Sequence, residues 1–277
     1  MGLHRLDEEA WLEVDRRRAG ELLAKARLLE DARTDVLAAA PGALAACEEL
    51  AGLIEANLTS THPGLLFRDR GAIVETTTSL RYDPAAMHPL ELAARIVQED
   101  LCVLERREGH WRLTAACVCF PSRWRLADKL GATLAEIHGP VPGFDRALGS
   151  TTATFFDRLR VERPVWRLNW TLLDTPELHL PSASSRRSRE AIRDPATSLW
   201  FRVERQTLRR LPASGAIVFT IRTYVTALGE LLAQRPGAAA ALRDTLVTVP
   251  VDVASYKGWS GLLDELTAWL DLRASDR

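Results

Sequence analysis

The spacing of hydrophobic positions divides the chain into a helical first part, a strand-rich middle and a helical end. Residues 7–58 place apolar side chains at helical spacing, with Pro41 and Gly42 as an interruption, which predicts two or more helices. Residues 59–83 are less regular, and residues 88–100 predict a helix with Pro89 near its first turn. Helical spacing returns after residue 225.

In the middle of the chain the hydrophobic period changes to two, which is typical of strands. Residues 101–106 and 111–120 predict two strands, joined by a short loop that contains Gly109. The other predicted strands are residues 165–173, 199–211 and 216–225, with the turn 212–215 between the last two.

Two helices and one loop are predicted to interrupt this block of strands. Residues 125–138 follow helical spacing and are ended by Gly139 and Pro140, which are typical stop signals. Residues 144–159 predict a second helical piece. Residues 182–189 are rich in Ser and Arg, and we expect them to form a mobile loop.

Five predicted strands in one block favour an antiparallel sheet, because most of them follow one another through hairpins. Helices segregated to the two ends of the chain favour an α+β fold. We expect a single domain over residues 1–277, with a mainly helical region at 1–97, a core at 98–225 and a helical region at 226–277. The chain contains neither GxGxxG nor GxxxxGK[ST], so a nucleotide-binding α/β fold has no support.

Composition narrows the classes of partner. The 277 residues are 47% hydrophobic, which is ample for a buried core. Basic and acidic residues number 36 and 37, so a net charge of −1 gives no reason to expect binding to nucleic acid or to an anionic membrane. The chain has neither the apolar stretch of a membrane span nor the apolar segment of a signal peptide, and we expect a cytoplasmic protein.

The four cysteines do not indicate a metal site. Cys47, Cys102, Cys117 and Cys119 form no CxxC pair and have no histidine at metal-ligand spacing, so neither zinc nor an iron–sulfur cluster on this chain is indicated. Cys117 and Cys119 lie two residues apart in an apolar run and would share one face of a strand. We expect buried, reduced thiols.

His138 is the first candidate for chemistry. The predicted helix 125–138 carries one apolar stripe, made of Leu126, Leu130, Leu134 and Ile137, and His138 lies at its end. A neutral imidazole is a common ligand of metal ions, including haem iron. Spacing alone favours a different interpretation, in which His138 is a core residue bonded to a backbone carbonyl or a charged residue stabilised by the helix dipole.

The last two predicted strands carry the second group of candidates. Alternation places Arg202, Glu204 and Gln206 on one face of residues 199–211. The hairpin is expected to bring six polar side chains into a small area: Arg202, Glu204, Arg205, Gln206, Arg222 and Tyr224. If they line a cavity, they could bind carboxylates or polarise a bound ligand. The alternative is a solvated face with cross-strand ion pairs.

Four segments occur in an order that resembles one family: QEDLCVLERREGHWRLTAACVCFPSRWRLADKLGATLAEIHGPVP, then RLNW, then LWFRVERQTLRRLPASGAIVFTIRTY, then YKGW. They are similar to the haem-dependent oxidative N-demethylase α-subunit family. The resemblance covers about residues 11–270 and is densest from 98 to 224. FPSRW…KLG…IHGPVP and RVERQTL…FTIRTY have no generic structural explanation.

The resemblance implies a PAS-like, haem b-binding domain with a five-stranded antiparallel sheet. It also implies a mono-oxygenase that uses O2 to oxidise a methyl group of a small secondary amine such as dimethylamine, giving a primary amine and formaldehyde. Electrons would come from NADPH through a partner reductase that carries FMN and a 2Fe–2S cluster. The chain has neither a Rossmann fingerprint nor a cluster-type set of cysteines, so a separate reductase would be required, and an oligomer is compatible with the sequence.

The resemblance also changes the interpretation of His138, which in IHGPVP corresponds to the proximal ligand of the haem iron. Chemistry suggests Lys129, Arg202 and Arg205 as partners of the haem propionates. Arg222 and Tyr224, together with Glu204, are expected to act in catalysis on the distal side.

A histidine ligand gives less electron push for O–O cleavage than a thiolate, so a polar distal pocket or the amine itself must help. The alternative function is a non-catalytic PAS-type haem module that senses a gas or binds another ligand, because fold alone does not determine activity. A sensor usually needs an output helix, whereas residues 253–270 could serve only for packing.

Overall fold

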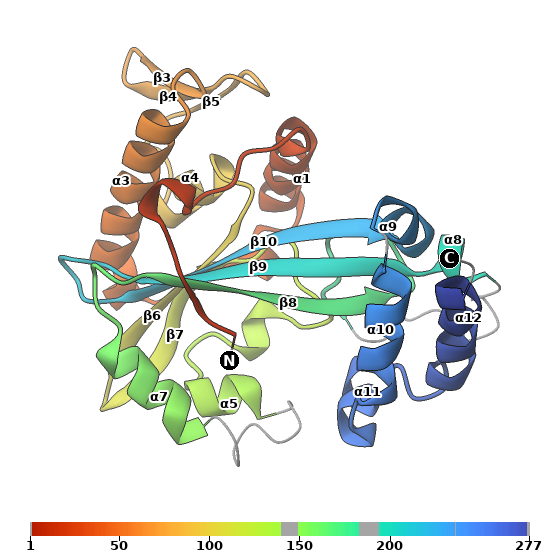
Figure 1. Cartoon of the computed structure of the whole chain (residues 1–277). Coiled ribbons are helices and arrows are strands. Elements are labelled where there is room, and N and C mark those ends of the chain that lie inside the picture. Colours follow the sequence, from red (N-terminus) through yellow and green to blue (C-terminus); the bar gives the residue numbers. More distant parts are fainter. Residues whose placement is uncertain (1, 140–148, 183–193, 236, 276–277) are drawn as a thin grey trace.

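The computed structural model describes residues 2–139, 149–182, 194–235 and 237–275. Its centre is a seven-stranded antiparallel sheet with strand order β1-β8-β9-β10-β6-β7-β2 (Figure 1). The strands are β1 (His4–Arg5), β2 (Leu37–Ala39), β6 (Asp100–Arg107), β7 (His110–Cys117), β8 (Val165–Leu173), β9 (Trp200–Arg210) and β10 (Ile217–Ala227).

The five long strands of this sheet are those that the sequence predicts, and the α+β class is confirmed. The edge strands β1 and β2 were missed, because two or three residues are too few to show a period of two. The turn between β6 and β7 has Glu108 and Gly109 at φ 51° and 81°, the left-handed pair that a two-residue hairpin loop requires.

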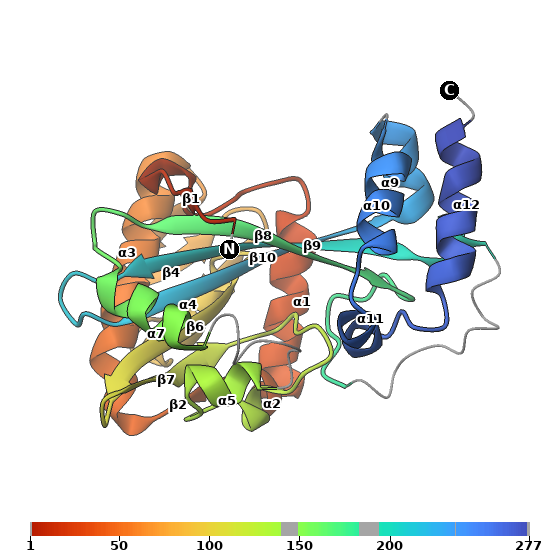
Figure 2. The same cartoon turned by 60° about the horizontal axis from the view of Figure 1, so that its bottom comes forward.

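One face of the sheet is covered by the N-terminal helices, and we call it the α1 face (Figure 2). Buried Leu50, Leu101 and Val218 belong to one apolar cluster between these helices and the sheet. The helices are η1 (Glu8–Ala10), α1 (Arg18–Asp31), α2 (Arg33–Val36), η2 (Pro41–Ala43), α3 (Leu44–Thr61) and α4 (Pro89–Arg95).

The helix predicted at 88–100 ends earlier, at Arg95. The next carbonyl groups accept hydrogen bonds from buried side chains of α1, with Arg18 bound to Ile96 O at 2.8 Å and Lys25 to Val97 O at 2.9 Å. These contacts satisfy the backbone where helical bonds would otherwise be needed. The chain is therefore free to enter β6 at Asp100.

The opposite face, which we call the α5 face, is covered at one end by η3 (Leu126–Asp128), α5 (Leu134–His138) and α7 (Gly149–Arg158). Leu104, Leu113 and Ile217 form a second buried cluster beneath these helices. Residues 144–148 of the predicted helix 144–159 lie outside the described part, as do residues 183–189 of the predicted loop.

The single helix predicted at 125–138 was wrong over its first half. Gly131 has a φ of 79°, a left-handed conformation that ends a helix. Its N–H donates to Leu113 O at 2.7 Å, so this stretch borders β7. Thr133 and Glu136 then form a capping box that starts α5. His138 still ends the helix, but the apolar stripe is not one continuous helical face.

Residues 59–83, expected to be irregular, contain a separate three-stranded sheet (Figure 1, top). Its strands have only three or four residues each, too short for a periodic signal. They are β3 (Leu66–Asp69), β4 (Ala72–Glu75) and β5 (Leu80–Tyr82).

The C-terminal region is helical, as predicted, and gathers at one end of the long strands (Figures 1 and 2). Buried Leu172, Leu199, Trp259 and Leu266 form a third apolar cluster there. The helices are α8 (Pro195–Ser198), α9 (Leu228–Gln234), α10 (Ala238–Val247), α11 (Val251–Lys257) and α12 (Leu263–Ser275).

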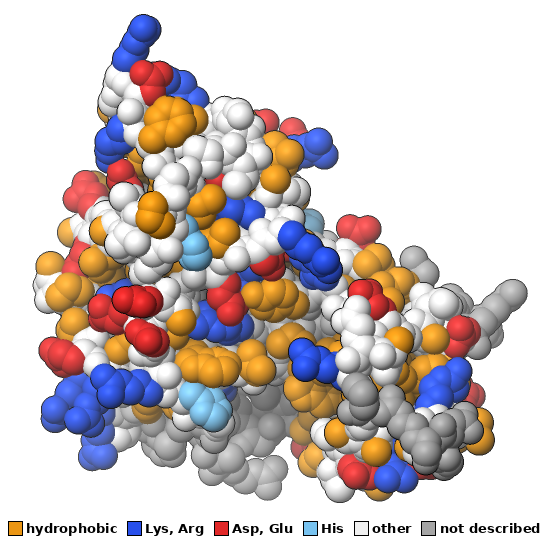
Figure 3. Space-filling view, turned by 45° about the horizontal axis from the view of Figure 1, so that its top comes forward, with side chains coloured by type: hydrophobic (Ala, Val, Ile, Leu, Met, Phe, Trp, Pro, Cys, Tyr) orange, Lys and Arg blue, Asp and Glu red, His pale blue; other side chains and the backbone are white. Residues whose placement is uncertain are grey.

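Two further properties bear on the sequence-based expectations. The four cysteines are buried free thiols, as predicted, and burial raises the pKa of Cys102. None of the described helices combines the length and apolar composition that a bilayer crossing requires. Basic and acidic side chains are interspersed over the surface shown in Figure 3.

Candidate functional site

The hairpin β9–β10 separates the predicted polar residues between the two faces of the sheet. Arg222 lies directly opposite Arg205, and Thr223 lies opposite Glu204. Because side chains alternate along a strand, Arg205, Arg222 and Tyr224 point to the α1 face, whereas Arg202, Glu204 and Gln206 point to the α5 face. The expectation that all six share one area was therefore wrong, because three of these side chains lie on each face of the sheet.

Arg222 is fully buried against carboxylates of the N-terminal segment. Its guanidinium lies 2.8 Å from Asp15 Oδ2 and 2.9 Å from Glu21 Oε2. Burial tends to raise the pKa of Asp15, but hydrogen bonds from Gln98 and Arg17 and the charge of Arg222 outweigh it and lower that pKa. Arg222 thus holds the chain before α1 against the sheet.

Tyr224 and Arg205 have the same kind of partner. The Tyr224 hydroxyl donates to Glu13 Oε2 at 2.6 Å. Arg205 donates to the backbone oxygens of Ala10 and Trp11 at 2.6 and 3.1 Å. Their polar groups are therefore bound to the N-terminal segment, on the face that α5 does not cover.

On the α5 face, a row of polar side chains crosses β8 and β9. Arg167 Nε donates to Gln206 Oε1 at 2.8 Å, and Gln206 Nε2 donates to Glu204 Oε2 at 3.0 Å. The amide of Asn169 lies 3.4 Å from the same carboxylate oxygen. Asn169 is exposed and Arg167 and Glu204 are half-buried, so the row is open to a ligand.

Arg202 lies on this face but is committed to the backbone. It is fully buried, and its guanidinium donates to Phe120 O at 2.5 Å and to Leu178 O at 3.2 Å. It also lies 3.2 Å from Glu204 Oε1. Arg202 therefore holds the segment after β7 and fixes the position of Glu204.

His138 is half-buried at the end of α5. Its Nδ1 lies 2.8 Å from Leu134 O. Donation from Nδ1 to this carbonyl selects the neutral tautomer with the lone pair on Nε2, the form that ligates metals. Burial lowers the pKa of His138, and the charges of Arg167 and Lys129 lower it further against the opposing effect of the Leu134 carbonyl. The imidazole is thus held neutral.

Lys129 supports α5 from below. Its Nζ donates to Ile137 O at 2.6 Å, and burial lowers its pKa. Two positive groups, Lys129 and Arg167, therefore lie close enough to His138 to influence its protonation.

The YKGW segment borders the far side of the polar row. Lys257 Nζ donates to Trp170 O at 2.8 Å, and Trp259 Nε1 donates to Leu172 O at 3.2 Å. The rings of Trp170 and Trp259 stack at 5.5 Å. These contacts dock α11 on the backbone of β8, where the ring of Trp170 lies on the same face as Val203 and Tyr224.

Glu204 is the carboxylate that interacts both with the polar row of β8 and β9 and with residues of α11. Burial lowers the pKa of Lys257, and the charge of Glu204 opposes that effect. The pKa of Tyr256 is raised by burial and by Glu204. Glu204 therefore lies near α11 as well as beside Arg167.

Sequence reasoning missed Arg167 and Lys257. Their signals were the motifs RLNW and YKGW, but only the register of β8 with β9 and the docking of α11 give them their partners, Gln206 and Trp170.

The groups on the α5 face are of the types that hold an iron porphyrin. His138 offers a neutral imidazole for iron, and the cations near it suit propionates. Leu208 and Phe219 are partly buried and belong to the same apolar cluster as Ile137, which suits a flat apolar ring.

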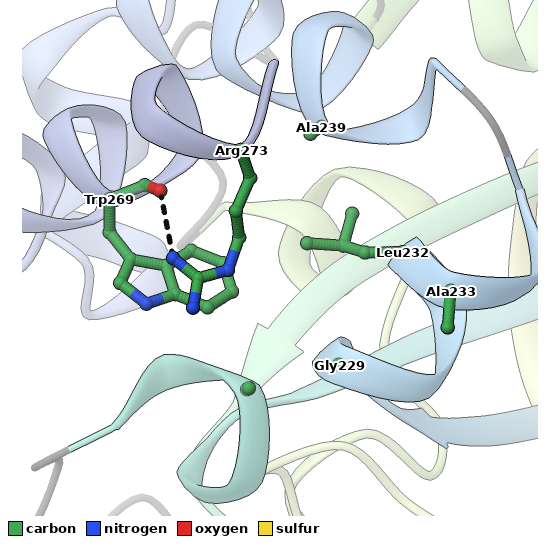
Figure 4. A pocket seen from close by; sticks show the side chains of 7 residues that line it. Gly229, Leu232, Ala233, Ala239, Trp269 and Arg273 are labelled. Atoms are coloured by element: carbon green, nitrogen blue, oxygen red, sulfur yellow. Dashed lines mark hydrogen bonds between the residues drawn. The ribbon is translucent and has the colours of Figure 1, made fainter. Parts of the chain in front are cut away.

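A separate pocket lies among the C-terminal helices (Figure 4). The Arg273 guanidinium lies 3.7 Å from the centre of the Trp269 ring. None of the four motifs contributes to its lining, which consists of Ala196, Gly229, Leu232, Ala233, Ala239, Trp269 and Arg273.

The chain matches a family model described as haem-dependent oxidative N-demethylase, alpha subunit-like, over residues 2–267. The match covers nearly the whole chain and contains IHGPVP, RLNW, the β9–β10 hairpin and YKGW.

Proposed function

The chain belongs to the haem-dependent oxidative N-demethylase, alpha subunit-like family, and we propose that its α5 face holds haem b with His138 as the iron ligand. The observation that carries this proposal is the 2.8 Å contact between His138 Nδ1 and Leu134 O, which directs the lone pair to Nε2. The lowered pKa of His138 favours the same neutral form.

We further propose Arg167 and Lys129 as partners of the propionates. Both lie near His138, and Arg167 is half-buried on the open row. Arg202 and Arg205 are weaker candidates than the sequence indicated. The guanidinium of Arg202 is bound to loop carbonyls, and that of Arg205 lies on the α1 face.

The proposed reaction is the oxidative N-demethylation of a small secondary amine, such as dimethylamine, to a primary amine and formaldehyde. When bound, haem would supply the activation of O2. An alpha subunit implies other subunits, and we propose that one of them is a reductase that delivers electrons from NADPH through FMN and a 2Fe–2S cluster.

Residues of this chain would bind and orient the amine. Glu204 attracts an alkylammonium by its charge and can accept a hydrogen bond from it, and its carboxylate is held in place by Arg202 and Gln206. Leu208 and Phe219 would exclude water beside the reacting methyl group. A PAS-like description of the five central strands is part of this proposal.

Haem binding is tested by the absorption spectrum of the full chain purified with haem supplied. We expect a Soret band in the wild type and its loss or a large shift in His138→Ala. His110→Ala, at the exposed start of β7, should keep the band. A wild-type protein without a Soret band would contradict the proposal.

Activity is tested by formaldehyde release from dimethylamine with a surrogate reductant. Tight O2 binding without turnover would instead favour a gas sensor. A sensor would need an output helix that is free to signal. The candidate, α12, is packed instead, because Leu266 and Leu270 are buried in the C-terminal apolar cluster.

A further inference from the structure

Glu99 is a buried carboxyl group that has no part in the proposed function. The residue is 1% exposed and directly precedes β6. One carboxyl oxygen, Oε1, accepts the backbone N–H of Glu13 at 2.9 Å. The other, Oε2, is buried without a hydrogen-bond partner among the described residues. A carboxylate ionised in such a place is costly, because only one of its oxygens is stabilised.

The pairing of β6 with β10 brings Glu99 next to Arg222. Asp100 lies opposite Ile221 in this pairing. The residue before Asp100 and the residue after Ile221 therefore meet at the same end of the pair, because the strands are antiparallel. Glu99 and Arg222 each act on the pKa of the other, as this proximity requires.

The cations that face Glu99 are already bound to other groups. Arg222 holds Asp15 of the segment before α1 at 2.8 Å and Glu21 of α1 at 2.9 Å. The fully buried Lys25 of α1 donates to two backbone oxygens, at 2.9 and 2.5 Å. In this part of the described chain, three carboxyl groups thus face two cations, and one proton removes the excess negative charge.

The side chain of Glu13 does not change this balance, because it has its own partners. Its Oε1 lies 3.4 Å from Arg205 Nε of β9. Its Oε2 accepts the hydroxyl of Tyr224 of β10 at 2.6 Å. The proton is therefore required by Glu99 and its neighbours of α1 and β10.

We propose that Glu99 is a neutral carboxylic acid in the folded protein and that its ionisation, as the pH rises, releases the segment before α1 from the sheet. An ionised Glu99 competes with Asp15 for the guanidinium of Arg222. Asp15 is the carboxylate that gives way, since it is 30% exposed whereas Glu21 is 7% exposed. The contact of Asp15 with Arg222 is one of those that bind this segment to β10. The inference does not depend on the haem site.

The direction of the pH dependence follows from the surroundings of the carboxyl group. Burial raises the pKa of Glu99, against the opposing effects of the Glu13 N–H and of the charges of Arg222 and Lys25. A raised pKa means that the folded protein binds this proton more tightly than the unfolded chain does. The stability that the proton contributes is therefore present at low pH and is lost as the pH rises through the folded-state pKa.

The test is urea unfolding of the full chain and of Glu99→Gln, which resembles the neutral acid, at several pH values. We expect the unfolding constant of the wild type, divided by that of the variant, to increase at least about tenfold between about pH 5 and pH 9. Glu99→Met carries the same expectation if the Gln variant does not fold.

Glu75→Gln is the matched control at a second fully buried glutamate. Burial acts to raise the pKa of Glu75, but hydrogen bonds from Thr78, Thr77 and Arg18 outweigh it and lower that pKa. Glu75 is therefore ionised in the folded and unfolded states above about pH 5. Its ratio of unfolding constants should stay within about twofold over the same range.

Release of the segment is measured separately, by tryptic cleavage after the exposed Arg16. At about pH 9 we expect the wild type to be cleaved at least about threefold faster than Glu99→Gln, because cleavage follows the population of the opened segment. Near neutral pH the two rates should be closer.

A ratio of unfolding constants for Glu99→Gln that is constant or falls with rising pH would overturn the neutral acid. So would an equal rise for Glu75→Gln. Equal cleavage of the wild type and Glu99→Gln at the highest pH would overturn the release of the segment.

Discussion

Glu204 lies opposite Thr223, the next residue after Arg222, across the β9–β10 hairpin. The side chains of Arg222 and Glu204 therefore point to opposite faces of the sheet. The guanidinium of Arg222 is surrounded by Asp15 and Glu21 and has no exposure to solvent. Glu204 is half-buried in an open polar row. At the scale of single residues, burial and partners therefore distinguish a group that stabilises the fold from one that can meet a ligand.

Replacement of Arg222 by Met should destabilise the protein by about 3–5 kcal/mol, because it leaves buried Glu21 and half-buried Asp15 without their partner. Urea unfolding measures this loss. Arg68→Met, at an exposed pair with Glu55, should cost less than about 1 kcal/mol. In folded Arg222→Met the Soret band should be that of the wild type, and its loss would show that Arg222 acts on the haem.

At the scale of elements, the segment before His138 shows how a local conformation positions a ligand. Gly131 turns the chain at a φ of 79°, and Thr133 caps a helix of five residues. Helical spacing at 125–138 could not reveal this turn, since the stripe of leucines fits a continuous helix equally well. The glycine itself was the available signal.

Gly131→Ala should destabilise the protein by about 1–2 kcal/mol, because an L-residue is strained at this φ. Gly52→Ala is the matched control: Gly52 is exposed within α3 and has open space for a Cβ atom. There alanine should stabilise by about 0.5–1 kcal/mol. Equal effects of the two substitutions in urea unfolding would contradict the role given to the turn.

The long strands were predictable because each carries enough residues for a period of two, whereas β1 to β5 do not. The candidate site was predictable only in part. His138 was identified from the motif IHGPVP, and Glu204 from the alternation of side chains along its strand. Arg167 depends on strand register and Lys257 on the docking of α11. These contacts join residues 39 and 87 positions apart, which local spacing does not encode.

At the scale of the whole molecule, Trp259 joins the C-terminal helices to the sheet. It is 3% exposed, stacks on Trp170 and is bonded to Leu172 O. The expectation of one domain over residues 1–277 requires that this junction unfold together with the core.

Trp259→Ala should lower the free energy of unfolding by about 3–5 kcal/mol through the cavity it leaves. Near- and far-ultraviolet circular dichroism should follow a single shared transition in the wild type. Leu272→Ala, at an exposed position of α12, should change stability by less than about 0.5 kcal/mol. Two separate wild-type transitions would show that the chain divides into independent units.

The alternation along β9 also constrains how such a protein can evolve. Its even-numbered positions Glu204 and Gln206 belong to the polar row on the α5 face, and the neighbouring Arg205 and Thr207 belong to the scaffold. Substitutions at the even positions can therefore alter ligand preference while the packing beneath α1 stays intact. An insertion of one residue within β9 would exchange the two sets, and specificity and foldability would be lost in a single genetic event.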